Sequence, residues 1–322
     1  MDLPVVLMPK PMNPAVADDL DGVCELIKLW ELDDPDAVLD ARRDEIVAVA
    51  AGGGLIDGAF LDRLPAVRIV ASFGVGYDRI DAAAAAERGV VVTNTPGVLD
   101  AEVADTAMGL LLMTARELPQ AERYLRDGKW QTGAYPLTPV TLSGRRMGIL
   151  GLGRIGQAIA DRAAPFGISI AYHNRHEKDV PYPYYPSLVD LAHAVDILMI
   201  VIPGGDSTRH LVDAEVLKAL GPTGILINVA RGSIVDEQAL VDALRTNTIL
   251  SAGLDVFEHE PTPHPDLLTL PNTVLLPHVG SATTPTRNAM AALVAANLKS
   301  WFNSNTALTP VPESMELPGA SG

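Results

Sequence analysis

The chain has 322 residues, 48% hydrophobic and 20% charged, so it is long enough for about two domains and apolar enough to bury their cores. Its formal net charge of −16 argues against a surface that binds phosphate backbones, and we expect no nucleic acid partner. The one cysteine, Cys24, excludes an intrachain disulfide, and neither a basic leader nor an apolar run of about 20 residues is present, so we expect a cytoplasmic protein that does not enter membranes.

Short apolar, β-branched runs alternate with alanine-rich stretches along most of the chain, in two sets. The first set comprises the runs at 5–8, 45–51, 68–73 and 90–95. The second set comprises the runs at 147–151, 168–173, 196–202, 224–230 and 249–257. Continuously apolar strands separated by helices are typical of parallel sheets with helices on both faces. The sequence therefore predicts an α/β fold with two doubly wound parallel-sheet domains.

Two long helices are expected outside these strands. The first, at about 100–126, is interrupted only by Gly109 and Pro119 and has apolar positions on more than one face, which suits a buried hinge between domains. The second, at about 286–302, follows the last strand of the second set. Since the first set has no helix left to close it, we expect this helix to return there, which makes the first domain discontinuous. The tail, 306–322, is rich in Pro, Ser and Gly and is expected to be loosely ordered.

The segment GLGRIG, from Gly151 to Gly156, lies between a predicted strand and a predicted helix. Gly151 permits a tight turn, Gly153 lets a diphosphate approach the backbone, and Gly156 allows the helix to pack closely on the strand. A diphosphate would then lie at the positive end of the helix, beside Arg154 and Ile155. The pattern predicts a dinucleotide site, since a merely structural turn does not explain three glycines at this spacing. No spacing of Cys and His is typical of a metal site, and we expect no metal.

The segment AYHNRHEK decides which dinucleotide is expected. Sites of this kind usually carry an acidic residue roughly 20 positions after the glycines, which binds the ribose hydroxyls of NAD. The chain has Asn174 there, followed by Arg175, His176 and Lys178. Asn174 has no charge to repel a 2′-phosphate, and Arg175 can pair with it through two charge-assisted hydrogen bonds, so we expect NADPH to be preferred, with NADH as a usable alternative. The other interpretation is that Arg175 points to solvent and that Asn174 binds the ribose of NADH.

Three later segments each end a predicted strand and begin a loop, where doubly wound sheets bind their ligands. They are INVARGSIVDE, GLDVFEHEP and LLPHVGSAT. They supply an arginine, a glutamate beside a proline, and a histidine. Taken singly, each has a plain alternative: a surface arginine, a loop glutamate, or one of seven histidines, among which His259 and His264 are close rivals to His278.

These segments, in this order after the glycine loop, closely resemble the D-2-hydroxyacid dehydrogenase family. SFGVGYDRID and TNTPGVLDAEVADTAMGLLL match its two other signature regions, and the resemblance covers about residues 70–305. GKWQTGAYPLTPVTLSG most resembles the glyoxylate/hydroxypyruvate reductase subgroup and its hydroxyphenylpyruvate-reducing relatives. The resemblance implies NADPH-dependent reduction of small 2-oxo acids, among them glyoxylate, hydroxypyruvate and aryl pyruvates, to D-2-hydroxy acids. It also implies a Rossmann NADP-binding domain, 99–284, inserted in a flavodoxin-like substrate domain made of 1–98 and 285–322.

Catalytic and substrate-binding roles carry over from the family to matching positions. His278 would be the general acid that protonates the carbonyl oxygen while hydride reaches the carbon. Glu260 would pair with His278 and favour its protonated form. Arg231 would bind the substrate carboxylate and polarise the keto oxygen. The backbone amides of Val75 and Gly76 would bind the same carboxylate; the alternative for their segment is a plain strand-ending turn.

The resemblance also implies cofactor contacts beyond the glycine loop. Asp255 matches the aspartate that meets the nicotinamide carboxamide, with a strand-end cap as the alternative. Pro203 and Thr208 would lie on the adenosine side. The remaining implied contacts are made by Thr106, Ala230, His278 and Gly280.

Two other functions remain open for a chain with this resemblance. An NAD-dependent D-3-phosphoglycerate-type dehydrogenase would need basic groups for the substrate phosphate, and the FGVGYD loop supplies only Arg79. A non-enzymatic dinucleotide-sensing protein of the same fold would not need the arginine, the glutamate and the histidine.

In related reductases the tryptophan that matches Trp130 reaches the substrate pocket of the neighbouring subunit, so we expect a homodimer. The alternative is that Trp130 packs under its own loop.

Overall fold

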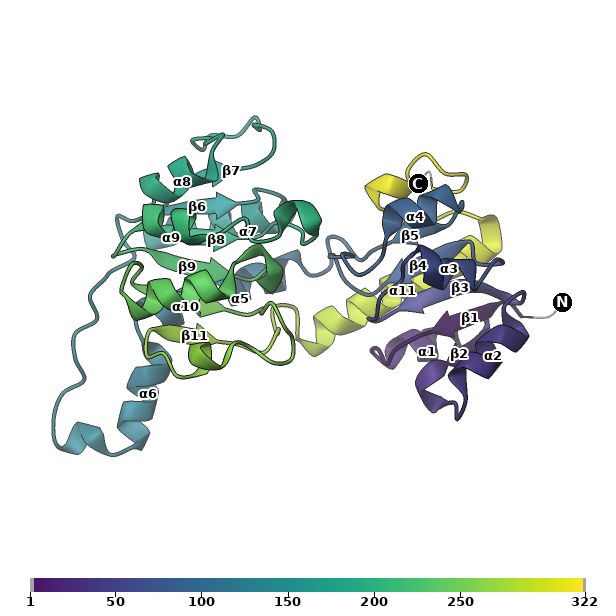
Figure 1. Cartoon of the computed structure of the whole chain (residues 1–322), viewed down its shortest axis with the longest axis horizontal. Coiled ribbons are helices and arrows are strands. Elements are labelled where there is room, and N and C mark those ends of the chain that lie inside the picture. The colour runs from purple at the N-terminus through teal and green to yellow at the C-terminus, as the bar shows by residue number, and fades with distance from the viewer. Residues whose placement is uncertain (1–2, 321–322) are drawn as a thin grey trace. The chain divides into compact units, whose positions relative to one another are not determined.

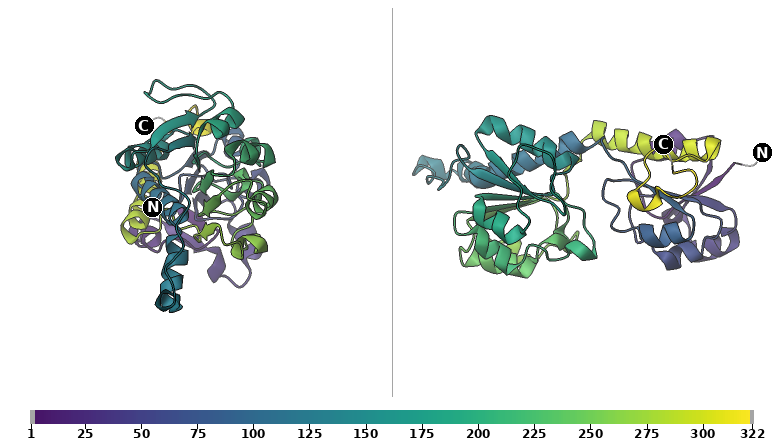
Figure 2. Two further views of the ribbon diagram at one scale, coloured as in Figure 1. Left: turned by 90° about the vertical axis from the view of Figure 1, so that its left-hand side faces the viewer. Right: turned by 90° about the horizontal axis from the view of Figure 1, so that it is seen from above.

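The computed structural model describes residues 3–320, and the chain divides into two compact units (Figure 1). Unit 1 comprises the residues up to Leu99 together with those from Thr283 onward, and unit 2 comprises Asp100–Ala282. Each unit is built on its own parallel sheet, and helices cover both faces of each sheet (Figure 2). Within residues 3–320, no helix combines the length and the apolar content that crossing a membrane requires.

The sheet of unit 1 has five parallel strands in the order β2-β1-β3-β4-β5, which is the flavodoxin-like order. The strands are β1 (Val5–Met8), β2 (Glu25–Lys28), β3 (Ile46–Ala51), β4 (Ile69–Ser72) and β5 (Val91–Thr93). Alternate residues of β1 enter different cores: Val5 and Leu7 join one, Val6 and Met8 the other. Because both faces of the strand are buried, its sequence is continuously apolar.

Five helices cover the sheet of unit 1 within the described residues. They are α1 (Ala15–Leu20), α2 (Pro35–Arg42), α3 (Gly58–Asp62), α4 (Ala82–Glu87) and α11 (Thr284–Ser304). Leu39 of α2, Leu61 of α3 and Ala85 of α4 pack in the first core. Leu20 of α1 and Leu298 of α11 pack in the second. The C-terminal helix therefore returns to the sheet of the first set of strands.

The sheet of unit 2 has its strands in the order β11-β10-β9-β8-β6-β7, and every pair is parallel. The strands are β6 (Arg146–Leu150), β7 (Ser169–His173), β8 (Ile197–Ile200), β9 (Ile225–Asn228), β10 (Ser251–Leu254) and β11 (Thr273–Leu275). Beyond β7, Tyr184 forms one parallel bridge with Tyr172. With that bridge counted as a strand, the order is the Rossmann order extended by one strand at the far edge. Pro181, Pro183 and Pro186 flank the bridge and lack the N–H groups that a longer edge strand would use.

The helices of unit 2 also lie on both faces of its sheet. They are α5 (Asp100–Ala115), α6 (Leu118–Arg126), α7 (Arg154–Ala163), α8 (Leu188–Ala194), α9 (Ala214–Leu220) and α10 (Glu237–Arg245). Leu191 of α8, Leu217 of α9 and Leu240 of α10 share one core. On the other face, α5 packs beside α7 and against β9 and β10.

The prediction of one helix over 100–126 is wrong, because the chain forms α5 and α6 with a break between them. Glu117, at the break, has φ +50°, and Pro119 lies in the first turn of α6. Proline has no N–H to donate to the carbonyl of residue 115, and its ring crowds that carbonyl, so the first helix ends there. Gly109 remains inside α5 without interrupting it.

The prediction of a loosely ordered tail is also wrong for its described part, residues 306–320. The hydroxyl of Ser314 is buried and accepts the N–H of Val92 at 2.9 Å. Pro310 forms an antiparallel bridge with Thr93, and Val311 packs in the core of unit 1. The tail therefore covers the outer edge of β5, where unpaired backbone groups need partners, and its prolines lie where few N–H donors are required.

Candidate active site

The glycine loop joins β6 to α7. Gly151 has φ +103°, and a Cβ on it would lie 2.8 Å from the carbonyl oxygen of Val201. A Cβ on Gly156 would lie 2.4 Å from the carbonyl oxygen of Gly151, so only glycine lets α7 pack this closely on the loop. Gly153, the N-cap of α7, has open space at its Cβ position. The loop therefore leaves room for a ligand beside the first turn of α7.

Two predicted contact residues, Arg154 and Ile155, form that first turn. The Arg154 guanidinium lies 3.3 Å from the carboxylate of Asp100, and the Arg154 side chain is 65% exposed. Asp100 is only 16% exposed, so the open side of the guanidinium is the side that a ligand at the start of α7 could reach.

A buried tyrosine anchors the backbone of the loop after β7. Tyr172 is fully buried, and its hydroxyl both accepts the Lys178 N–H at 2.8 Å and donates to the Lys178 carbonyl at 3.1 Å. Asn174 Oδ1 accepts the N–H of Leu152 at 2.7 Å, which ties this loop to the glycine loop. The side chains of Arg175 and Lys178 are exposed. A fixed backbone therefore presents cationic groups beside the glycine loop.

The arginine, glutamate and histidine of the three strand-end motifs come together in unit 2. Arg231, Glu260 and His278 follow β9, β10 and β11, which are neighbours in the sheet. Because the carboxyl ends of parallel strands meet at one edge, their loops are adjacent. His278 Nδ1 lies 2.8 Å from Glu260 Oε2. That bond uses Nδ1, so Nε2 is the nitrogen that can face a ligand, and the side chain is 46% exposed.

The charge state of Glu260 follows from its surroundings. Burial alone would raise the pKa of this carboxyl, but the hydrogen bond and charge of His278, the Phe257 N–H and the charge of Arg231 outweigh it and hold the pKa below its ordinary value. Glu260 is therefore an anion opposite the His278 ring at neutral pH. A carboxylate placed in this way fixes the orientation of an imidazole ring.

His278 has a left-handed backbone with φ +54°, and Asp255 supports it. The Asp255 carbonyl accepts the N–H of His278 at 2.8 Å, while its carboxylate oxygens accept the N–H groups of Val279 at 2.7 Å and Gly280 at 2.8 Å. Thr106, on α5, donates its hydroxyl to the carbonyl of Gly280 at 3.1 Å. Asp255 therefore caps the strand end and fixes the loop that carries the histidine.

The other predicted cofactor contacts lie at strand ends of the same sheet. Thr208 Oγ1 donates to the carbonyl of Pro203 at 3.0 Å and closes the turn after β8. Ala230 is buried after β9, and its N–H donates to Asn228 Oδ1 at 3.0 Å. Asn228 Nδ2 in turn donates to the carbonyl of Arg231 at 2.9 Å. Asn228 thus shapes the turn that carries Arg231, a role that the sequence reasoning missed although an asparagine ends a buried apolar strand there.

The predicted carboxylate-binding segment belongs to unit 1. Val75 and Gly76 follow β4 in a turn in which Gly74 has φ +152°. The Asn94 side chain donates to the carbonyl of Val75 at 2.9 Å, and the N–H of Thr95 donates to the carbonyl of Gly74 at 2.9 Å. Asn94, which the sequence reasoning also missed, therefore shapes this turn from the neighbouring strand end.

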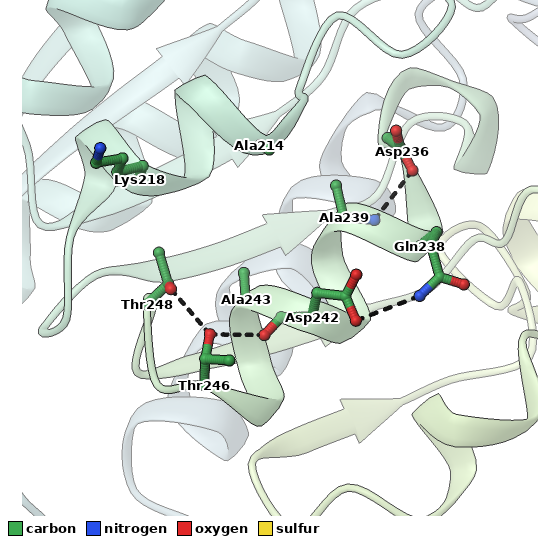
Figure 3. A pocket seen from close by; sticks show the side chains of 9 residues that line it. All are labelled: Ala214, Lys218, Asp236, Gln238, Ala239, Asp242, Ala243, Thr246 and Thr248. Carbon is green, nitrogen blue, oxygen red and sulfur yellow. Dashed lines mark hydrogen bonds between the residues drawn. The ribbon is translucent and has the colours of Figure 1, made fainter.

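A groove of about 520 Å³ lies between α9 and α10, and none of the predicted site residues lines it (Figure 3). Both of its carboxylates already have partners: Asp236 caps α10 at the N–H of Ala239, and Asp242 accepts from Gln238. The groove is therefore separate from the candidate active site. Among residues 3–320, no group of three or more His, Cys, Asp and Glu side chains is arranged to hold a metal ion.

Comparison with known proteins agrees with the geometry. The family profile described as "D-isomer specific 2-hydroxyacid dehydrogenase, NAD binding domain" matches residues 108–280. The chain is 46% identical to glyoxylate/hydroxypyruvate reductase A from Arabidopsis thaliana over 95% of this chain and 98% of that one. It is 44% identical to hydroxyphenylpyruvate reductase from Plectranthus scutellarioides, with the same shares covered.

A solved structure is also similar over nearly the whole chain. It is an NADPH-dependent glyoxylate/hydroxypyruvate reductase from Sinorhizobium meliloti in complex with NADP and malonate. The two chains are 52% identical, 97% of each is covered, and the TM-score is 0.92.

Proposed function

Because the chain belongs to the D-isomer specific 2-hydroxyacid dehydrogenase family, we propose that it uses NADPH to reduce small 2-oxo acids to D-2-hydroxy acids. The substrate class comprises glyoxylate and hydroxypyruvate, and extends to aryl pyruvates. Relatives named for both kinds of substrate, a glyoxylate/hydroxypyruvate reductase and a hydroxyphenylpyruvate reductase, support this range.

The observation that carries the proposal is the His278–Glu260 pair, with the charge of Arg231 acting on the same carboxylate. When bound, the nicotinamide supplies the hydride that reduces the carbonyl carbon. His278 Nε2 donates the proton to the carbonyl oxygen, and Glu260 holds the ring in place and balances its charge. Arg231 binds the carboxylate and polarises the keto oxygen through its planar donors. The N–H groups of Val75 and Gly76 bind the carboxylate as well.

The glycine loop fits a dinucleotide on structural grounds, since it is tight at Gly151 and Gly156 and open at Gly153. Gly151, Gly153, Arg154, Ile155 and Gly156 would hold the diphosphate at the start of α7. Thr208 and Pro203 would contact the adenosine side, and Thr106, Ala230, Asp255 and Gly280 the nicotinamide side.

The preference for NADPH rests on the loop after β7. Arg175 and Lys178 are exposed on a loop whose backbone Tyr172 holds, in a chain with a net charge of −16. A local cationic group on an acidic protein favours a ligand with an added phosphate. The Sinorhizobium meliloti relative, described as NADPH-dependent and bound to NADP, supports this choice.

The test is steady-state oxidation of NADPH and NADH by the purified protein with glyoxylate, hydroxypyruvate, pyruvate, phenylpyruvate and 3-phosphohydroxypyruvate. Turnover of the first two with NADPH at higher kcat/KM than with NADH is expected. Turnover confined to the phosphorylated acid would support the phosphoglycerate-type function instead. Cofactor binding without turnover of any acid would support a dinucleotide sensor.

The same proposal includes a homodimer, supported by α6 and the segment that follows it. Within unit 2 these form an arm in which no residue of α6 is buried (Figure 1). Leu125 is 55% exposed, Trp130 68% and Leu137 98%, so Trp130 does not pack under its own loop. Three large apolar side chains exposed on one arm favour, as part of this proposal, a surface that a second copy covers. Light scattering of the active protein should give twice the chain mass, and an active monomer would contradict the dimer.

A further inference from the structure

Four side chains join three loops at the carboxyl edge of the sheet in unit 2, and we call them the Glu258 cluster: Arg209, His210, Glu237 and Glu258. Glu258 Oε1 accepts from Arg209 Nη2 at 2.6 Å and lies 2.8 Å from His210 Nε2. The N–H of Glu258 donates to Glu237 Oε1 at 2.6 Å. The Glu258 side chain is only 12% exposed, and Glu237 is buried. Glu258 is therefore held by both its side chain and its backbone.

Two of the loops that meet at this cluster, those after β9 and β10, carry the proposed catalytic groups Arg231 and Glu260. The N–H of His210 donates to the carbonyl of Ser233 at 2.8 Å, in the turn directly after Arg231. His210 has φ +50°, a conformation that L-residues rarely adopt, which aims its ring at Glu258. The turn also rests on Gly232, where a Cβ would lie 1.8 Å from the carbonyl carbon of Phe257.

Glu260 itself has little support from its own turn. The N–H of Phe257 donates to Glu260 Oε1 at 3.2 Å, and the other carboxylate oxygen faces His278. A shift of the backbone at Glu258 would therefore move Glu260 directly. Arg209 and His210 are partly exposed, at 54% and 36%, but the Glu258 carboxylate that they contact is only 12% exposed and takes both donors on one oxygen.

We propose that Glu258 is a positioning residue that holds the turn from Phe257 to Glu260 so that the Glu260 carboxylate faces His278 Nδ1. The cluster thereby couples the loop after β8, proposed to contact the cofactor, to the catalytic pair. Turnover can report this role of Glu258 only if the proposed function is correct. The experiment therefore includes a second readout that does not depend on the proposed function.

Glu258→Ala should lower kcat for glyoxylate by about ten- to a hundredfold, the scale of a small misplacement of a catalytic group, and change the KM values for NADPH and glyoxylate far less. Glu258→Gln, which keeps an oxygen acceptor, should recover most of the loss. Asp266→Ala is the matched control, because it removes an exposed ion pair with Arg245 (2.7 Å) in the same unit and should leave kcat unchanged. Wild-type kcat in Glu258→Ala would overturn the proposal.

A double variant separates positioning from a general structural role. If Glu258 acts through Glu260, then Glu258→Ala combined with Glu260→Gln should be no slower than Glu260→Gln alone. A further tenfold loss in the double variant would overturn the proposal. If Glu258→Ala does not fold, Arg209→Ala is measured in its place. It removes one of the two donors to Glu258 Oε1 and should also lower kcat.

The second readout is the NMR signal of the His278 ring in protein labelled only at its seven histidines, assigned by its loss in His278→Ala. Glu258→Ala should shift the ring signals of His278, and Asp266→Ala should not. An unshifted His278 signal in a folded Glu258→Ala protein would overturn the proposal. If the wild type reduces no 2-oxo acid, the proposed function fails while this signal still decides the role of Glu258.

Discussion

Replacing Tyr172 with Phe should weaken NADPH binding and leave NADH binding nearly unchanged. The hydroxyl of this fully buried side chain makes two hydrogen bonds to the backbone of Lys178, at 2.8 and 3.1 Å, and closes the loop that presents Arg175. The ring itself stays in the core, so Phe removes the loop anchor without opening a cavity.

The size of the effect follows from these two bonds. Each contributes about 0.5–1.5 kcal/mol net, and Lys178 is exposed, so water can replace the lost partner and the lower half of the range applies. A total of about 1–2 kcal/mol must then be supplied when NADPH orders the loop, which corresponds to roughly a five- to thirtyfold rise in its KM. NADH has no 2′-phosphate and does not need the loop to be ordered.

Steady-state kinetics with both cofactors at saturating 2-oxo acid measures this difference. Tyr135→Phe is the control, because it also removes a partly buried hydroxyl hydrogen bond, to Glu117 at 2.8 Å, but one that lies outside the loop after β7. An equal rise in KM for NADPH and NADH would refute the reasoning, since Tyr172 would then support the whole dinucleotide site rather than the phosphate loop.

Three further variants test the site. Arg175→Ala should raise the KM for NADPH by about ten- to a hundredfold and barely affect NADH; equal use of both cofactors by the wild type would contradict this. His278→Ala should lower kcat by about two to four orders of magnitude in a protein that melts normally, and near-normal turnover would remove the general-acid role. The pKa of Glu260 in the folded protein is lower than the ordinary glutamate pKa of the unfolded chain. The Glu260 carboxylate therefore stabilises the folded state at pH values above the ordinary pKa, and this stabilisation is lost as the pH falls through the lower pKa of the folded state. Urea unfolding of wild type and Glu260→Gln across acidic pH should therefore show a stability difference that shrinks towards low pH, and a constant difference would argue against the pairing.

Much of the fold could be predicted because burial on both faces leaves a clear pattern in the sequence. Most strands of both sheets are continuous apolar runs, although the edge strand β2 (ELIK) carries Glu25 and Lys28 and is only partly buried. α11 could be assigned to the first sheet because it follows the last strand of the second set. The break at Glu117 was missed because Pro119 was taken as a tolerated interruption rather than as the start of a new helix. The ordered tail was missed because composition does not show which edge a segment covers.

Sequence reasoning singled out candidate site residues where a residue ends a strand within a family motif, and not where a residue only shapes a neighbouring turn or loop. Arg231, Glu260 and His278 stand at the ends of neighbouring strands, so parallel topology alone brings their loops together. Asn228 acts on backbone groups two and three positions away, and Glu258 contacts side chains 48 and 49 positions away, and no spacing in the sequence indicates such partners.

The two carboxylates near His278 show why position decides their roles. Burial dominates at Asp255 and raises its pKa, although it accepts the N–H groups of Val279 and Gly280 and feels the charge of His278. At Glu260 burial is again the largest single influence, but the hydrogen bond and charge of the same histidine, the Phe257 N–H and the charge of Arg231 together outweigh it and lower the pKa. Environments that separate two neighbouring carboxyl groups in this way assign them different tasks. Glu260 therefore contacts the His278 ring directly at Nδ1, whereas Asp255 holds the left-handed backbone that aims the ring.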